Sequence, residues 1–228
     1  MRVNIFGRLS YPNLFEKSVN KKFPNNPPAY SCMLIFSKES VEKGKKLFDP
    51  AARNDEAWKK FCTDLIITPQ QLRTIAKQAA EKFFPVGCKT RPKDFEKDKE
   101  FRLIPKNSAD EPNYSERPGY GPGTFFVGDK NEKLQPYLFD PRKQPVIEFT
   151  PTLLYPGCFV IVQADIYPTG VAHGANRGVS LNLLAVTHIA EGERLGGSVG
   201  NIDEYPEIAM PDGFGGEPAG DGFDVEFY

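Results

Sequence analysis

CFVIVQADIY at residues 158–167 and GVSLNLLAVTHIA at residues 178–190 decide the fold of this sequence. Apolar and polar side chains alternate along both runs, which is the pattern of β-strands with one buried face. A glycine-rich loop joins the two runs, so we expect them to be long, curved, antiparallel neighbours. The sequence therefore predicts a fold built around a β-sheet.

Shorter runs upstream of this hairpin also have the character of strands. The expected strands are residues 2–6, 8–11, 30–36, 123–128, 133–140 and 145–149. A turn is expected at Asp129 to Glu132, where polar residues follow one of these runs. Strands so closely spaced, with turns between them, favour a mainly β domain.

Helices are expected only between residues 38 and 84, where the apolar period changes from two to about 3.6. The expected helices are residues 39–48, 54–62 and 69–83. The third has local start signals, because Thr68 can cap it, Pro69 suits its first turn and Gln71 completes a capping box. Residues 85–122 are rich in Pro, Lys, Asp and Gly and are expected to form a long loop, of a kind that is often functional.

Composition excludes several classes of protein. Of the 228 residues, 39% are hydrophobic and 12% aromatic, whereas 20 Gly and 21 Pro interrupt the chain too often for a helical bundle. No run approaches the roughly 18 apolar residues of a membrane span, and the N-terminus lacks the apolar region of a signal peptide. We expect one cytosolic domain with an appendage and no membrane partner.

Charge divides the chain into two parts. All 29 Lys and Arg lie at or before Arg194, whereas 22 acids lie up to residue 199 and 8 after it, so the body carries +7 and the tail −8. This asymmetry suggests a basic surface for a polyanion and an acidic interaction tail, or simply a solvated, disordered end. The tail ends in FDVEFY at residues 223–228, and aromatic groups there suit a docking motif.

The four cysteines, at positions 32, 62, 88 and 158, include no CxxC pair. Neither a disulfide framework nor a zinc site is expected from this spacing. Cys32 and Cys158 lie in alternating apolar runs and are expected to be buried free thiols.

Catalytic motifs are absent from the sequence. Its two histidines, His173 and His188, lie in no recognisable catalytic pattern, and there is no nucleophile elbow, Walker loop or HExxH. We therefore expect no enzymatic activity, cofactor or metal. A hydrolase that uses Cys158 or His173 remains an alternative.

Aromatic and basic residues recur together around the expected strands. A site for single-stranded nucleic acid needs this mixture, because cations neutralise phosphates while exposed aromatic faces stack on bases of any identity. The expected nucleic-acid-binding residues are Arg8, Tyr11, Arg91, Lys93, Arg117, Tyr120, Phe126, Lys130, Tyr167 and Arg177. The alternative for each aromatic is a place in the core, although Phe125 and Phe126 can both be core only if two faces are covered. Tyr120 and Tyr167 are favoured because a phenol tolerates a half-exposed position.

Five segments, taken in order, resemble the tailed-phage single-stranded DNA-binding proteins. The segments are RLSYPNLFE at 8–16, RPGYGPGTFFVGDKN at 117–131, LLYPGCFVIVQADIYPT at 153–169, RGVSLNLLAVTHIAEGERLGG at 177–197 and the acidic aromatic tail. The resemblance covers most of the chain except the helical insertion and the loop at 85–116. It implies an OB-fold barrel that binds single-stranded DNA without sequence preference, and a tail that recruits replication and recombination proteins.

We therefore expect a mainly β protein with a helical insertion, an α+β fold. An OB-fold-like five-stranded antiparallel barrel would occupy residues 1–197, with the insertion at 38–84 and the long loop at 85–122, and residues 198–228 would be a disordered acidic tail. The resemblance implies a role in DNA replication, recombination and repair in the cytoplasm of an infected bacterial host. The expected partner-binding residues of the tail are Asp221, Phe223, Asp224, Glu226, Phe227 and Tyr228. The alternative from another class is a virion structural or assembly protein whose barrel binds protein.

Overall fold

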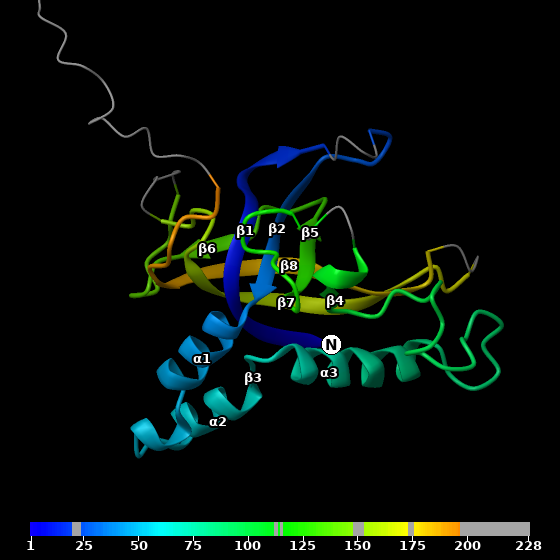
Figure 1. The fold of residues 1–228 in the computed structure, drawn as a ribbon, viewed down its shortest axis with the longest axis horizontal. Helices are drawn as coiled ribbons and strands as arrows, with labels where there is room; N and C mark the ends of the chain where they lie inside the picture. Colours follow the sequence, from blue (N-terminus) through cyan, green and yellow to red (C-terminus); the bar gives the residue numbers. More distant parts are fainter. Residues whose placement is uncertain (20–23, 112–113, 115, 148–152, 173–175, 197–228) are drawn as a thin grey trace, which may run out of the picture. The chain divides into compact units, whose positions relative to one another are not determined.

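In a computed structural model of the chain, five strands close into a barrel (Figure 1). They are β1 (Arg2–Ser18), β2 (Ala29–Phe36), β5 (Phe125–Asn131), β7 (Phe159–Thr169) and β8 (Gly178–Ala190). The order around the barrel is β1–β2–β5–β8–β7, and β7 pairs with β1 again. The pairing of β5 with β8, which closes the barrel, is parallel, and the other barrel pairings are antiparallel. The predicted fold class is confirmed.

The structure describes residues 1–19, 24–111, 114, 116–147, 153–172 and 176–196. Residues 1–196 form one compact unit. The expected disorder of the acidic tail, its six partner-binding residues and His173 all lie outside the described residues.

The strand β1 is continuous where the sequence predicts two strands. Its pairing with β2 shifts register between Ser10 and Asn13, and Tyr11 there has a positive φ of 44°. This bulge lets the strand continue past Pro12 with a stronger local twist. The chain therefore bends at Pro12 without leaving the sheet.

The expected turn at Asp129 to Glu132 is wrong, because β5 continues to Asn131. The side chains of Asp129 and Asn131 are buried, and the Asn131 amide donates to the Leu183 carbonyl oxygen at 2.8 Å. The sequence predicts a turn here because polar residues are typical of turns, whereas Asp129 and Asn131 point into the barrel.

The predicted hairpin of β7 and β8 is confirmed. The two strands pair antiparallel from Val160 and His188 to Thr169 and Gly178.

The structure has three helices between residues 38 and 84, where the sequence predicts them. Figure 1 shows them below the barrel strands. They are α1 (Lys38–Leu47), α2 (Glu56–Asp64) and α3 (Pro69–Phe83), with the short elements η1 (Pro50–Ala52) and β3 (Leu65–Ile66) between them. The helix α3 has the predicted bounds and the predicted capping box of Thr68 and Gln71. No helix of the described residues is long and apolar enough to cross a membrane.

The main core fills the barrel and the space beneath α3, where Leu72 and Ala76 are fully buried. A second cluster joins α1 and α2 to β1 and β7 through the rings of Phe6, Phe48 and Phe159. The approach of α1 requires glycine at position 44, because an added Cβ would lie 2.6 Å from Ile67 Cγ2.

Three short elements complete the described fold. They are β4 (Lys106–Asn107), η2 (Ser108–Asp110) and β6 (Tyr137–Phe139). The strand expected at 133–140 shortens to β6, which pairs parallel with β8. Of the strand expected at 145–149, Pro145 forms a single bridge with Phe139, and residues 148 and 149 lie outside the described residues.

Candidate nucleic-acid interface

A groove of about 400 Å³ lies over β2 and β5, with walls from β1, β7, β8 and residues 102–106. Its aromatic lining residues are Tyr11, Tyr114, Phe126 and Tyr167, and its cationic ones are Arg102, Lys106 and Lys130. Four of the ten sequence-predicted residues therefore line one groove: Tyr11, Phe126, Lys130 and Tyr167. Tyr11 also lies near two further predicted residues, Arg117 and Tyr120.

Aromatic rings and a guanidinium group form a shelf at one end of this groove. The Tyr114 ring stacks on the Phe126 ring, with centroids 4.5 Å apart and planes at 28°. The guanidinium of Arg117 lies 4.3 Å from the Tyr114 centroid and 5.3 Å from that of Tyr11. Tyr11 is 44% exposed, so its ring offers a free face. We call Tyr11, Tyr114 and Arg117 the aromatic shelf.

The floor of the groove is open at Gly128. This residue lies on the outward face of β5 between Phe126 and Lys130, and it is exposed. A Cβ added there meets no atom within 4 Å. The strand backbone is therefore accessible at the centre of the groove, as a site for a flat, extended ligand requires.

The cations of the groove differ in whether they form ion pairs with carboxylates. Arg102 is exposed, and no carboxylate of the described residues lies within ion-pairing distance of it. Lys106 pairs with Glu111, and Lys130 pairs with Glu132. Such half-exposed ion pairs contribute little stability, so an incoming phosphate can replace the carboxylate.

Arg8 is a correction to the sequence-based expectation, because its side chain is only 8% exposed. Its Nε donates to the Gly157 carbonyl oxygen at 3.1 Å, another guanidinium nitrogen donates to the Glu193 carbonyl oxygen, and a third pairs with Glu39 at 3.3 Å. These bonds tie β1 to α1 and to the segment that follows β8. Arg8 is therefore an anchor within the fold rather than a surface cation.

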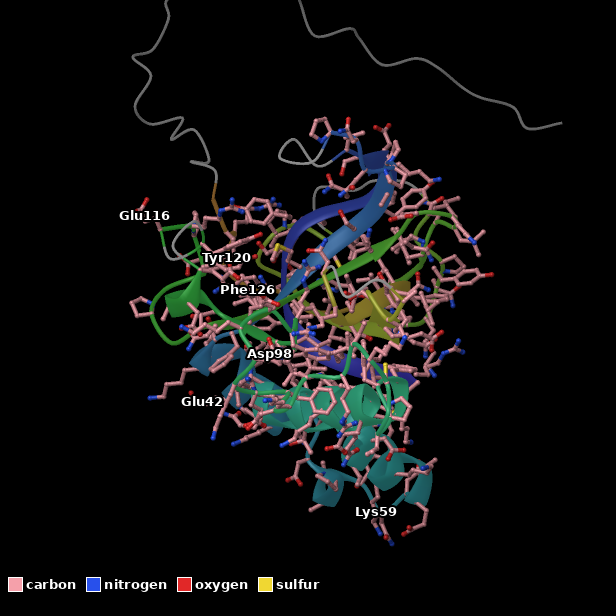
Figure 2. All side chains as sticks on the ribbon, turned by 90° about the vertical axis from the view of Figure 1, so that its right-hand side faces the viewer. Glu42, Lys59, Asp98, Glu116, Tyr120 and Phe126 are labelled. Atoms are coloured by element: carbon pink, nitrogen blue, oxygen red, sulfur yellow. The ribbon has the colours of Figure 1, made fainter. Side chains whose placement is uncertain are left out.

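Tyr120 is a second correction. It is fully buried, and its ring packs edge-on against Phe126 with centroids 5.3 Å apart. Figure 2 labels the two residues, which lie close together. Burial raises the pKa of its phenol. The expected half-exposed platform at this position is wrong, because Tyr120 supports the aromatic shelf from below. Phe125 is half-buried against the main core while Phe126 is buried on the opposite face, so two covered faces accommodate both rings.

The other expected cations lie outside the groove. Arg177 pairs with Asp98 at 2.7 Å and with Glu100 at 3.6 Å, and its side chain is only 20% exposed. Arg91 donates to the Phe84 carbonyl oxygen and its guanidinium lies over the Phe95 ring. Both residues hold the 85–107 segment in place. Lys93 is exposed in that segment, away from the groove lining.

The sequence-based reading missed Tyr114, Arg102, Lys106 and Gly128. The first three lie in a segment without apolar periodicity, where no strand pattern indicates which way a side chain points. A usable signal for Tyr114 was its spacing of three residues from Arg117. The signal for Gly128 was a glycine inside a strand pattern, which marks close backbone approach.

The cysteines confirm the expectation of buried free thiols at positions 32 and 158. Burial raises the pKa of Cys158 to about 12, so its sulfur is protonated at neutral pH. Because a thiolate is the nucleophilic form, the hydrolase alternative loses support at Cys158.

A closed five-stranded barrel with a groove of aromatic and cationic residues on its surface defines an OB-like ligand-binding protein. The family model described as "Enterobacter phage Enc34, ssDNA-binding protein" matches residues 43–214, which is 172 of the 228 residues. The chain belongs to this family. A search of curated proteins found no match.

Solved structures of phage proteins are similar to this chain. The single-stranded DNA-binding protein from bacteriophage Enc34 in complex with ssDNA is 17% identical, with 86% of this chain and 88% of that chain covered and a TM-score of 0.49. Its C-terminal truncation is 16% identical, with 85% and 87% covered and a TM-score of 0.45. The single-stranded DNA-binding protein gp2.5 of bacteriophage T7 is 13% identical, with 91% and 98% covered and a TM-score of 0.44.

Proposed function

We propose that this protein binds single-stranded DNA without sequence preference, and that it protects and presents single strands during phage DNA replication, recombination and repair. The observation that carries the proposal is the groove over β2 and β5, which combines the aromatic shelf with cations in a chain of this family. No catalytic step, cofactor or metal belongs to the proposal.

Binding in this groove would use two kinds of contact. Arg102, Lys106 and Lys130 would neutralise phosphates and release counterions, which favours any polyanion. Bases would stack on the free face of Tyr11 and on Tyr167, and stacking tolerates every base because each has a π-face. Bases that are already stacked in a duplex cannot use these rings, so single strands are preferred.

A fluorescence-anisotropy titration with an unstructured oligonucleotide and its duplex tests the proposal. Single strands should bind more tightly, and log affinity should fall with log salt at a slope of roughly −0.7 for each phosphate neutralised. Equal affinity for duplex and single strand at every salt concentration would rule out base stacking. Absence of binding by single strands would favour the alternative of a virion protein whose barrel binds protein.

Gly128→Glu is expected to weaken single-strand binding by at least about tenfold, because it places a carboxylate in the open floor of the groove. The matched control is Gly121→Glu, since Gly121 is also exposed with no atom within 4 Å of an added Cβ, but does not line the groove. Both variants change the net charge equally. Equal weakening by both would mean that charge alone matters and that the strand binds elsewhere.

We propose residues 198–228 as an acidic interaction tail that meets replication and recombination proteins. The support is its charge of −8 and its aromatic end at 223–228.

Deleting residues 203–228 should raise single-strand affinity, most at low salt, because it removes eight negative charges that repel phosphates. Phe227→Ala should spare DNA binding and impair partner recruitment in a pull-down. Unchanged DNA affinity on truncation, at low and physiological salt, would leave the charge only a role in solubility.

A further inference from the structure

The segment around β6 has exposed apolar residues that lie outside the groove. Tyr137 is 74% exposed, and its ring stacks on that of Phe139 with centroids 6.4 Å apart and planes at 21°. Leu134 and Ile147 are also largely exposed. We call these four residues the β6 platform. Single exposed apolar residues need no explanation, but a group that includes a stacked aromatic pair indicates a binding surface.

The β6 platform continues the outer wall of the groove. Along one edge of β8, Lys130 of β5 pairs with Asn182, and Tyr137 of β6 pairs with Ala185. The two positions are three residues apart on β8, which is about 10 Å along a strand. Figure 1 shows β6 beside β8 at this end of the barrel.

The side chains of these two positions face the same way. Leu138 is buried in the main core, so Tyr137 and Phe139 on either side of it must point outward. Lys130 is exposed between the buried Asp129 and Asn131, and therefore points outward too. A strand of nucleic acid that leaves the groove past Lys130 would meet the Tyr137 ring next.

Three cations flank the β6 platform in the sequence. Lys133, Arg142 and Lys143 are exposed, and no carboxylate of the described residues lies within ion-pairing distance of them. The nearby Asp140 accepts from the backbone N–H groups of Arg142 and Gln144, both at 2.8 Å, which fixes the turn. Glu132 is paired with Lys130. The three cations are therefore available for phosphates, as a site for a polyanion requires.

We propose that the β6 platform is a second base-stacking site for the same single strand, reached only by oligonucleotides long enough to pass Lys130. This inference rests on the proposed function. It extends the interface by one or more bases stacked on Tyr137 and by phosphates held by Lys133, Arg142 and Lys143. Binding should therefore become tighter with oligonucleotide length in a manner that depends on Tyr137.

The test compares dT oligonucleotides of about 6 and about 16 nucleotides, which span the site sizes of single OB folds. Tyr137→Val keeps an apolar β-forming side chain but removes the π-face, and Tyr137→Phe keeps the ring. Tyr137→Val should bind the long oligonucleotide about 5- to 150-fold more weakly than the parent, the range for one lost stack, and the short one equally. Tyr137→Phe should match the parent with both.

Three results would overturn the proposal. The first is a Tyr137→Val protein that binds both lengths as the parent does. The second is equal weakening for both lengths, which would place the effect in the groove. The third is a change in self-association of Tyr137→Val on sedimentation without a length effect, which would make the platform a protein contact. If the parent binds neither oligonucleotide, the proposed function fails first. Because Tyr137 is exposed, both variants should fold, and circular dichroism checks this.

Discussion

We expect the free energy of unfolding of the parent protein to fall as the pH rises from 5 to 8. Asp129→Asn is expected to remove most of this fall. Both carboxylate oxygens of Asp129 are buried, and neither has a hydrogen-bond partner among the described residues. Burial raises the pKa of this carboxyl from its ordinary value of 3.8 to about 8. The folded protein therefore holds a proton at neutral pH that the unfolded chain releases.

The sign of the pH effect follows from this difference. Between about pH 4 and pH 8 the folded state binds more protons than the unfolded state, so the free energy of unfolding falls as pH rises. The slope is about 1.4 kcal/mol per pH unit, and the penalty at pH 7 is on the order of 4 kcal/mol. His188 acts in the opposite direction, because burial lowers its pKa and its protonation at acid pH favours unfolding. Its contribution is common to parent and variant.

Urea unfolding at pH 5, 6, 7 and 8 measures this effect. The midpoint of the parent should fall steadily with pH relative to that of Asp129→Asn, whose amide does not titrate. Asp165→Asn is the control, because it removes a half-exposed carboxylate from β7, a barrel strand that does not pair with β5, and leaves Asp129 in place. It should keep the steep pH dependence. If the urea midpoints of the parent and of Asp129→Asn depend on pH in the same way, Asp129 is ionised in the folded state.

The sequence predicted elements whose determinants are local. The cap at Thr68, Pro69 and the apolar stripe all lie within α3, and its bounds were predicted without error. The last hairpin was also predicted, since its two alternating runs are adjacent in the sequence. The continuity of β1 was not predicted, because Pro12 indicates the end of a strand when only its sequence neighbours are considered. Residues on both sides of Pro12 pair with β2, and this pairing keeps β1 continuous through the bulge.

Prediction of the candidate site was limited by the direction in which side chains point. Tyr11 and Tyr167 line the groove as aromatic residues, whereas Tyr120 from the same pattern is buried beneath it. Whether an outward side chain reaches solvent depends on what covers the barrel, and here Tyr114 and Tyr120 cover part of β2 and β5. Composition and spacing therefore predict the kind of site, and the closure of the barrel determines which of the candidate residues share one surface.

Arg8→Ala is expected to destabilise the fold by roughly 3 kcal/mol, rather than to weaken DNA binding directly. Its guanidinium satisfies the carbonyl oxygens of Gly157 and Glu193 and pairs with Glu39. Hydrogen bonds from a charged donor contribute about 1.5–3 kcal/mol each, and the Gly157 oxygen would be left without this donor in a buried site. Denaturant unfolding at constant pH measures the loss as a lower midpoint with an unchanged m-value.

Arg2→Ala is the matched control, since Arg2 lies on the same strand but is 61% exposed and pairs only at the surface with Asp165. It removes the same charge and should leave the unfolding midpoint close to that of the parent. The salt slope of single-strand binding then distinguishes the two roles of Arg8. An anchor lowers the midpoint, and the folded fraction of the variant binds with the parental slope. A phosphate contact instead leaves the midpoint unchanged and makes the slope shallower by roughly 0.7, and that outcome would return Arg8 to the nucleic-acid interface.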